Sequence, residues 1–234
     1  MLSFNAYGSA SKETIGAHKP VWLGTVAPHA VGGVLASAYR VKGLLLPAGT
    51  PVNFTEGVIT PLVAWKVLSY TPGGSGSYDT IVIAGAKFGG IELAPAVDDY
   101  VQALGATFAT TGKAAQVVAV TPGTGDDAGK YTFTVAKAAN LGSLSEGDLI
   151  VPSTAVAAGT GKTMAAQPNG YLYNDIYLGN IESDINATGA VVDFHGEGLL
   201  VDFTPAYPVK AAMKVAVPNV IQVEFPDDAF VTIS

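Results

Sequence analysis

The sequence predicts a mainly β protein: a compact β-sandwich or barrel-like body with one or two short helices and an extended, irregular N-terminal arm. Short apolar segments alternate with a period of two residues, as in YDTIVIA at 78–84 and KYTFTVAK at 130–137. Clusters of Gly, Pro, Asn and Asp separate these segments at short and regular intervals. That spacing of strands and turns favours a β-dominated fold over a helical one.

Residues 1–42 are predicted to form the arm. Glycine, proline and serine interrupt each apolar run here before it reaches the length of a strand or a helix. The segment is nevertheless rich in large apolar residues, unlike a plain disordered tail. We therefore expect an arm that becomes ordered along a partner. The alternative is an irregular lobe that packs on the body of its own chain.

Residues 43–234 are predicted to form the β-rich body. After a turn at 47–50, the segment 63–68 has the alternation of a strand. Pro61 precedes it, and a proline has no N–H for a central ladder, so an edge position or a break is expected there. The Gly- and Ser-rich segment 72–77 is predicted to be the tip of a hairpin.

A helix is predicted over residues 94–105. Val97, Tyr100, Val101 and Leu104 have the i, i+3, i+4, i+7 spacing of one helix face. A proline precedes that face, acidic residues occupy the first turn, and a glycine follows the last residue.

The segments 114–121 and 130–137 are predicted to be strands around a polar tip, and 144–151 a turn followed by another strand. This places a projecting hairpin region at about residues 70–165. The fragment Gly161-Lys162-Thr163 resembles the end of a phosphate-binding loop, but valine stands where that loop needs its first glycine. We therefore interpret 158–163 as a flexible loop.

The last third of the chain alternates turns and strands. A turn at 168–170 precedes the strand segment 171–178, and 190–201 has the pattern of two strand pieces kinked at glycines. The segment 207–214 is predicted to be a short helix with proline near its start, and 218–225 a closing strand.

Composition excludes several classes of partner. Only 13% of the 234 residues are charged and 49% are hydrophobic, which fits a protein that covers surface against copies of itself or a larger partner. The net charge of −7 argues against nucleic acid and anionic lipid as partners. The chain has no cysteine, so it has neither a disulfide framework nor a thiolate metal site, and the redox compartment is left open. No apolar run reaches membrane-spanning length and the start lacks a signal-peptide pattern, so we expect a soluble protein made in the cytoplasm.

The sequence offers no constellation that predicts catalysis. His18, His29 and His195 form no zinc-binding motif, and His195 with Glu197 is interpreted as a surface or interface pair. The acidic doublets lack calcium-loop spacing, and there is no Gly-x-Ser-x-Gly elbow. A run at 127–133 resembles the tyrosine corner of immunoglobulin-like domains, but a simple hairpin explains it better. We expect a protein that is not an enzyme and needs no cofactor or metal.

Five segments together resemble a known family. They are LLLPAGTPVNF and GVITPLVAWKVL between residues 44 and 68, NGYLYND at 169–175, GAVVDFHGEGL at 189–199, and AAMKVAVPNVIQVEF at 211–225. In this order they resemble the head fibre or capsid decoration proteins of tailed bacteriophages. The resemblance covers roughly residues 43–225.

The resemblance implies a structural virion protein on the outer surface of the capsid, made in the host cytoplasm and commonly trimeric. The N-terminal arm would dock on the major capsid protein, and other head fibre proteins or the host surface would be further partners. Apolar residues of the arm are the candidates for docking, namely Trp22, Leu23, Val34, Leu35 and Tyr39. The alternatives are a tail or baseplate fibre component and a carbohydrate-binding β module.

Overall fold

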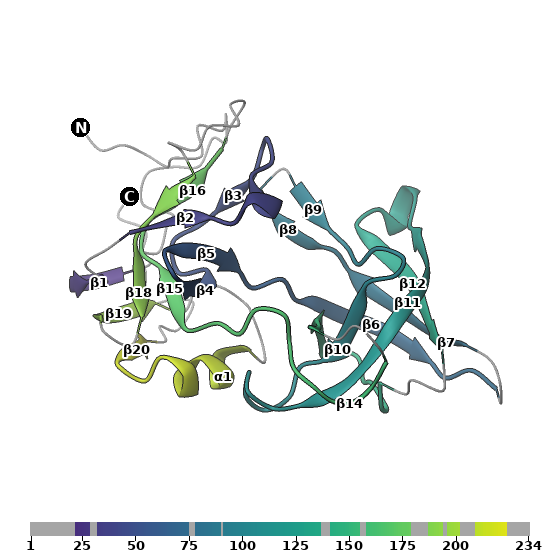
Figure 1. Cartoon of the computed structure of the whole chain (residues 1–234). Helices are drawn as coiled ribbons and strands as arrows, with labels where there is room; N and C mark the ends of the chain where they lie inside the picture. Colours follow the sequence, from purple (N-terminus) through teal and green to yellow (C-terminus); the bar gives the residue numbers. More distant parts are fainter. Residues whose placement is uncertain are drawn as a thin grey trace, which may run out of the picture. The chain divides into compact units, whose positions relative to one another are not determined.

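A computed structural model describes residues 22–28, 32–74, 78–89, 91–136, 141–154, 158–178, 187–193, 196–201 and 209–223. The chain folds into two compact units (Figure 1). Unit 1 takes in the described residues of Met1–Pro61, Pro168–Ala206 and Met213–Ser234. Unit 2 takes in those of Leu62–Gln167 and Tyr207–Ala212. The predicted projecting region, 70–165, lies within the longer segment of unit 2.

Unit 1 is built on a six-stranded sheet with the order β17-β2-β5-β4-β15-β18. Its strands are β2 (Gly33–Leu35), β4 (Pro51–Thr55), β5 (Val58–Pro61), β15 (Gly170–Leu172), β17 (Thr188–Gly189) and β18 (Val191–Asp193). The strands β3 (Leu45–Leu46) and β16 (Ile176–Tyr177) pair separately. Strand β5 ends at Pro61, so the chain leaves this sheet at the proline that was predicted to mark a break.

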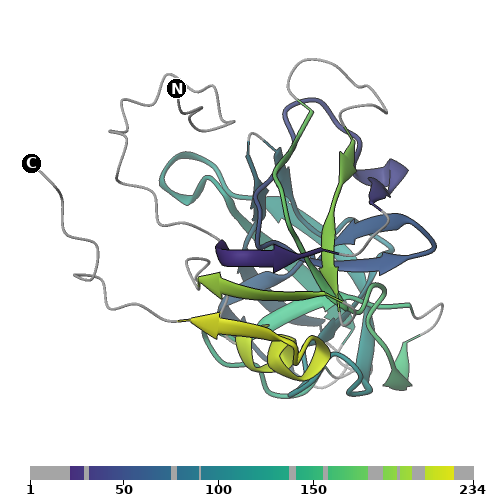
Figure 2. The same cartoon turned by 90° about the vertical axis from the view of Figure 1, so that its left-hand side faces the viewer.

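A second sheet of unit 1 contains three strands, β1 (Trp22–Ala27), β19 (Glu197–Val201) and β20 (Val220–Val223), in the order β1-β19-β20. Figure 2 shows these strands side by side, with the helix α1 (Val209–Ala216) preceding β20. The pairing of β19 with β20 is parallel, and α1 lies in the connection between them. A parallel pair requires such a crossover, which explains a helix at this point of a β-rich chain.

The core of unit 1 contains aliphatic side chains from two distant parts of the sequence. Leu35, Leu46, Ile59, Leu172 and Val191 are each 0% exposed. They come from strands β2, β3, β5, β15 and β18. Burial of these side chains ties together strands that are more than 100 positions apart in the sequence.

Unit 2 is an antiparallel barrel with one added strand. Its strands are β6 (Trp65–Thr71), β7 (Tyr78–Ala84), β10 (Tyr100–Ala103), β11 (Gly112–Pro122), β12 (Lys130–Ala136), β13 (Leu149–Pro152) and β14 (Gly159–Lys162). The order is β10-β13-β6-β7-β12-β11-β14, and β10 also pairs with β11, which closes a ring of six strands (Figure 1). A small hairpin of β8 (Ala86–Phe88) and β9 (Ile91–Leu93) follows β7.

The inward faces of these strands form the core of unit 2. Val67, Ile81, Ile83, Phe133 and Val135 are each 0% exposed and alternate along β6, β7 and β12 with more exposed residues. This is the period of two that the sequence shows in 78–84 and 130–137. The predicted mainly β, barrel-like fold is therefore confirmed.

The helix predicted over 94–105 is wrong. Residues 97–98 form a turn, with Asp98 at a φ of +73°, and 100–103 form strand β10. The backbone of this segment pairs with β11. The N–H of Asp98 donates to the carbonyl of Val117 at 2.9 Å, and the N–H of Val117 donates to the carbonyl of Asp99 at 2.8 Å. Val97 is 52% exposed, so the residues with helical spacing do not share one buried face. Pairing with a neighbouring strand overrides local propensity here.

Two other expectations need correction. The segment 158–163 is not a loop over its whole length, because 159–162 form strand β14 on the edge of β11. Within the predicted arm, 33–35 are a strand of the main sheet, and a short 3-10 helix, Ser37–Tyr39, follows. Unit 1 therefore has no boundary at residue 42, and the described residues 32–42 match the alternative of a lobe packed on its own chain.

The antiparallel pairs β6–β7 and β11–β12 flank 72–77 and 122–129 as predicted, although residues 75–77 themselves lie outside the described residues. The short helix and the closing strand near the C-terminus are also present as predicted. Residues 190–201 form two strands, β18 and β19, with Gly196 between them, also as predicted. The predictions for His18, His29 and His195 fall outside the described residues, as does the part of the arm before Trp22.

Candidate binding site

The five residues predicted for docking have different environments. Leu35 is completely buried in the sheet of unit 1, and its neighbour Val34 is half-buried. Tyr39 is also half-buried, and this burial raises the pKa of its hydroxyl above the ordinary value. The side chain of Leu23 lies outside the described part of the chain. Leu35 therefore stabilises its own unit and offers no surface to a partner.

Trp22 belongs to an aromatic cluster in unit 1. Its ring lies edge-on to that of Tyr171, with centroids 6.3 Å apart and an interplanar angle of 83°. The ring of Tyr173 lies 6.2 Å away at 48°. Tyr171 in turn accepts a hydrogen bond from Nε2 of Gln222. Tyr173 is 38% exposed, so one side of this cluster is accessible to solvent.

Unpaired polar atoms accompany the aromatic rings. Nε1 of Trp22 and Oε1 of Gln222 are buried and have no hydrogen-bond partner among the described residues. The first atom is a donor and the second an acceptor. A buried polar atom without a partner costs free energy, so these two atoms lower the stability of this part of unit 1.

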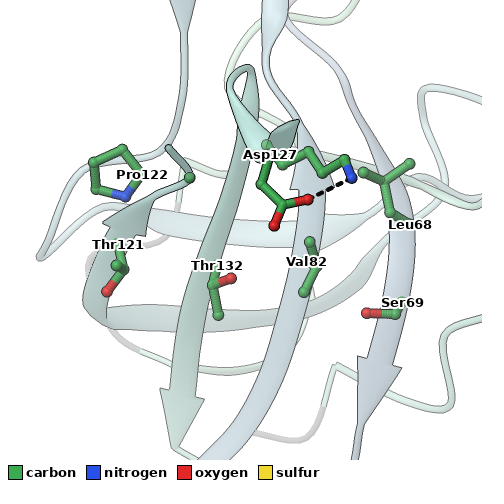
Figure 3. Close-up of a pocket in the computed structure, with 9 residues that line it drawn as sticks. Leu68, Ser69, Val82, Thr121, Pro122, Asp127 and Thr132 are labelled. Atoms are coloured by element: carbon green, nitrogen blue, oxygen red, sulfur yellow. Dashed lines mark hydrogen bonds and ion pairs between the residues drawn. The ribbon is translucent and has the colours of Figure 1, made fainter. Parts of the chain in front are cut away.

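Unit 2 carries a second candidate site, a hollow of about 400 Å³ on the outer face of the barrel (Figure 3). It lies over strands β6, β7, β12 and β11 and beside the tip of the β11–β12 hairpin. We refer to it as the hydroxyl hollow. It is lined by Leu68, Ser69, Val82, Thr121, Pro122, Gly123, Asp127, Lys130 and Thr132.

The strand register arranges the floor of the hydroxyl hollow. Ser69 is opposite Val82, Val82 is opposite Thr132, and Thr132 is opposite Thr121. These four residues form one row across four strands, in which neighbouring backbones are about 4.8 Å apart. The row therefore presents three hydroxyl groups and one isopropyl group to the same surface (Figure 3).

A β-bulge brings one more side chain to the hollow. Val67 is opposite Ile83 and Ser69 is opposite Val82, so Leu68 is an extra residue in β6. Because of this insertion, Leu68 and Ser69 both line the outer hollow, although adjacent strand residues normally face opposite ways. The next residue, Tyr70, is opposite the buried Ile81. A second bulge interrupts β11 between Val117 and Ala119.

The hairpin tip forms one wall of the hollow. Lys130 Nζ lies 2.6 Å from Asp127 Oδ1, and both side chains are well exposed, at 45% and 66% (Figure 3). A short 3-10 helix, Gly125–Asp127, turns the chain, and Gly125 and Gly129 have φ values of +62° and +85°. Gly123 approaches the backbone of Asp127 so closely that a Cβ there would overlap the carbonyl oxygen. Glycine at these positions allows the tight tip that places the ion pair beside the sheet.

The hollow is suited to hydrogen bonding of a small polar molecule. Its three hydroxyls can each donate and accept, the carboxylate accepts, and the ammonium donates. Leu68, Val82 and Pro122 add aliphatic surface. Among the described residues, no group of three His, Cys, Asp or Glu side chains is placed to hold a metal ion. Within the same residues, no helix has the length and apolarity needed to cross a membrane.

Sequence reasoning missed this site. The signal that could have found it is the outward half of each alternating strand, where Thr80, Val82, Thr132 and Thr134 are uncharged and β-branched. Solvent-exposed strand positions are often charged, so an uncharged series is informative. The bulge in β6 could not be seen in this way, and it decides that Ser69 joins the row.

Comparison of the chain with protein-family models, with curated proteins and with solved structures finds no match.

Proposed function

We propose that this chain is a structural, non-enzymatic protein of a bacteriophage virion that decorates the outer surface of the head by binding the major capsid protein. The observation that supports this proposal is the assembly of unit 1. The segments that resemble head fibre and decoration proteins include 44–61 and parts of 169–199, which are far apart in the sequence but contribute adjacent strands to one sheet. These parts of the resembling segments therefore belong to one module.

The connection between these segments supports a modular design. Pro61 and Gly170 are both opposite Val52, one from each neighbouring strand of β4. The chain thus leaves the sheet for unit 2 and returns to it only two strand spacings away, a separation of about 10 Å. Such close ends are what an inserted domain requires.

The aromatic cluster of Trp22, Tyr171 and Tyr173 is the docking surface we propose, in place of the buried Leu35. Trp22 and Tyr173 supply partly exposed aromatic area, the type of surface that is enriched at interfaces.

The location is tested by immunogold labelling of purified phage particles with antibodies raised against the chain. Gold over the heads supports the proposal. Gold confined to the tails would favour the alternative of a tail or baseplate component, and a chain that is absent from washed particles would overturn the virion role.

The docking surface is tested with particles that lack the chain, to which purified protein is added back. We expect Trp22→Ala to weaken cosedimentation with the heads by at least tenfold, the effect of losing an anchor worth more than about 1.4 kcal/mol. Tyr78→Ala, which removes a 53% exposed aromatic ring from unit 2, is the matched control and should cosediment like the unchanged protein. Equal loss in both variants would contradict the assignment.

The trimer that we expect is tested by light scattering on the full chain and on a form that lacks residues 1–21, which precede β1. A mass three times the chain's 23.8 kDa in both forms supports a self-associating body. A monomer in both would rule out a trimer that exists before assembly. Removal of residues 1–42 would be uninformative, because it deletes strands β1 and β2.

A further inference from the structure

We propose that the hydroxyl hollow of unit 2 binds one sugar residue of a neutral glycan. This site is separate from the proposed docking surface of unit 1, and the proposal does not depend on a capsid location. It follows from the chemistry of the lining residues, from their fixed arrangement and from the charge at the site.

The lining matches the two kinds of surface that a sugar ring presents. A pyranose has hydroxyl groups that each donate and accept hydrogen bonds, and patches of C–H groups between them. Ser69, Thr121 and Thr132 offer hydroxyls with the same double capacity. Leu68, Val82 and Pro122 offer aliphatic surface for the C–H patches. The volume of about 400 Å³ is at the lower end of the usual range for small-molecule sites, roughly 300–1,000 Å³.

The charge at the hollow favours an uncharged ligand. Asp127 and Lys130 are paired at 2.6 Å, so the ammonium is already neutralised and the two groups together carry no net charge. An anion such as phosphate would have to compete with Asp127 for Lys130 and would approach a chain of net charge −7. A sugar hydroxyl can instead donate to the carboxylate and accept from the ammonium without breaking the pair.

The hydroxyls are held in position before a ligand arrives. Thr121 and Thr132 lie directly opposite each other on paired strands, and Ser69 is fixed in the same row by the pairing of β6 with β7. Threonine has a restricted χ1, and its position on a sheet is more rigid than one on a loop. Little conformational entropy is then lost when a ligand binds.

The same face provides an internal control. Thr71 is opposite Thr80, Thr80 is opposite Thr134, and Thr134 is opposite Ala119, which makes a second row beside the first. This row has similar residues but does not line the hollow. Thr134 and Thr132 are both half-buried on β12, two positions apart and hence on the same face.

The test is a titration of the full, ¹⁵N-labelled chain, followed by NMR, with neutral methyl glycosides of glucose, galactose and mannose and with N-acetylglucosamine. At least one of these sugars should cause saturable shifts at the amides of Ser69, Val82, Thr121 and Thr132. Thr132→Val should weaken that binding about fivefold or more, as expected when one hydrogen bond is lost. Thr134→Val should bind like the unchanged protein, and the dispersed spectra of both variants report that they are folded.

Three results would overturn the proposal. The first is the absence of localised shifts with every sugar. The second is an equal loss of binding in Thr132→Val and Thr134→Val, which would show that the hollow is not the site. The third is a response of the same amides to inorganic phosphate but not to sugars, which would assign the hollow to anions.

Discussion

Asn169 forms two hydrogen bonds with the backbone of Phe54, a residue 115 positions earlier in the chain. Its Nδ2 donates to the carbonyl of Phe54 at 2.8 Å, and its Oδ1 accepts from the N–H of Phe54 at 2.7 Å. The side chain thus continues the strand pairing between β4 and β15 beyond the point where the backbones pair. It joins the two segments between which unit 2 is inserted.

Replacement of Asn169 should destabilise unit 1. Asn169→Ala removes the hydrogen bonds that the side chain makes to the N–H and to the carbonyl of Phe54. We therefore expect a loss of about 1–3 kcal/mol in the free energy of unfolding. Asn169→Asp should also be destabilising, because a carboxylate can accept from the N–H of Phe54 but places an oxygen against its carbonyl. Denaturant unfolding measures both effects. Thr55→Ala on the exposed end of β4 is the control, expected to change stability by no more than about 0.5 kcal/mol.

Replacement of Leu35 and of Val34 by alanine should have sharply different effects on stability, although the sequence predicts that both dock on a partner. Leu35→Ala removes a side chain that is 0% exposed, so we expect a loss of about 2–5 kcal/mol. Val34→Ala should cost clearly less, because Val34 is half-buried and loses a smaller apolar area. Chemical denaturation of the isolated protein provides the comparison. A Leu35→Ala variant of unchanged stability would contradict the placement of this residue in the core.

Ionisation of the Tyr70 hydroxyl should lower the stability of the folded protein in alkaline solution. Burial, with the charge of Asp79 and the hydrogen bond to it (3.2 Å), raises the pKa of the Tyr70 hydroxyl above its ordinary value of about 10. The folded protein then holds this proton more tightly than the unfolded chain does. The contribution to stability is fully present below about pH 10 and is lost as the pH rises through the folded-state pKa. Burial raises the pKa of Tyr39 as well, so its ionisation acts in the same direction.

The measurement is the free energy of unfolding from neutral pH to above pH 10. Tyr70→Phe should make the decrease at high pH shallower, because it removes one of the titrating groups. Tyr78→Phe is the matched control on the neighbouring strand, since Tyr78 is 53% exposed. If Tyr70→Phe left the pH dependence unchanged, the coupling of Tyr70 to Asp79 would not affect stability.

Unit 1 should fold without the long segment of unit 2. Replacement of residues 62–167 by about four Gly or Ser residues spans the separation of about 10 Å between the strands next to β4, because each extended residue covers about 3.3–3.6 Å. We expect a cooperative unfolding transition and NMR shifts of β2, β4 and β15 close to those in the full chain. A variant without dispersed resonances would show that unit 1 depends on unit 2.

The sequence alone determined the class of fold and most of the strands. In 78–84 and 130–137 the alternation of apolar and polar residues matches the two faces of a barrel wall, because one face of each strand must be buried. The short helix before β20 could also be predicted from the sequence, since proline near its start and the apolar spacing are local signals.

Only the tertiary structure decided the rest. The segment 94–105 has helical spacing, yet backbone pairing with β11 makes 100–103 a strand, and no local pattern reports such a neighbour. Strand β2 lies in the sheet of unit 1 because β5 and β17 satisfy its backbone. The hydroxyl hollow depends on a register between four strands and on one bulge in β6. Register and bulges are set by contacts between distant segments, so the residues of each strand can predict its faces but not its partners.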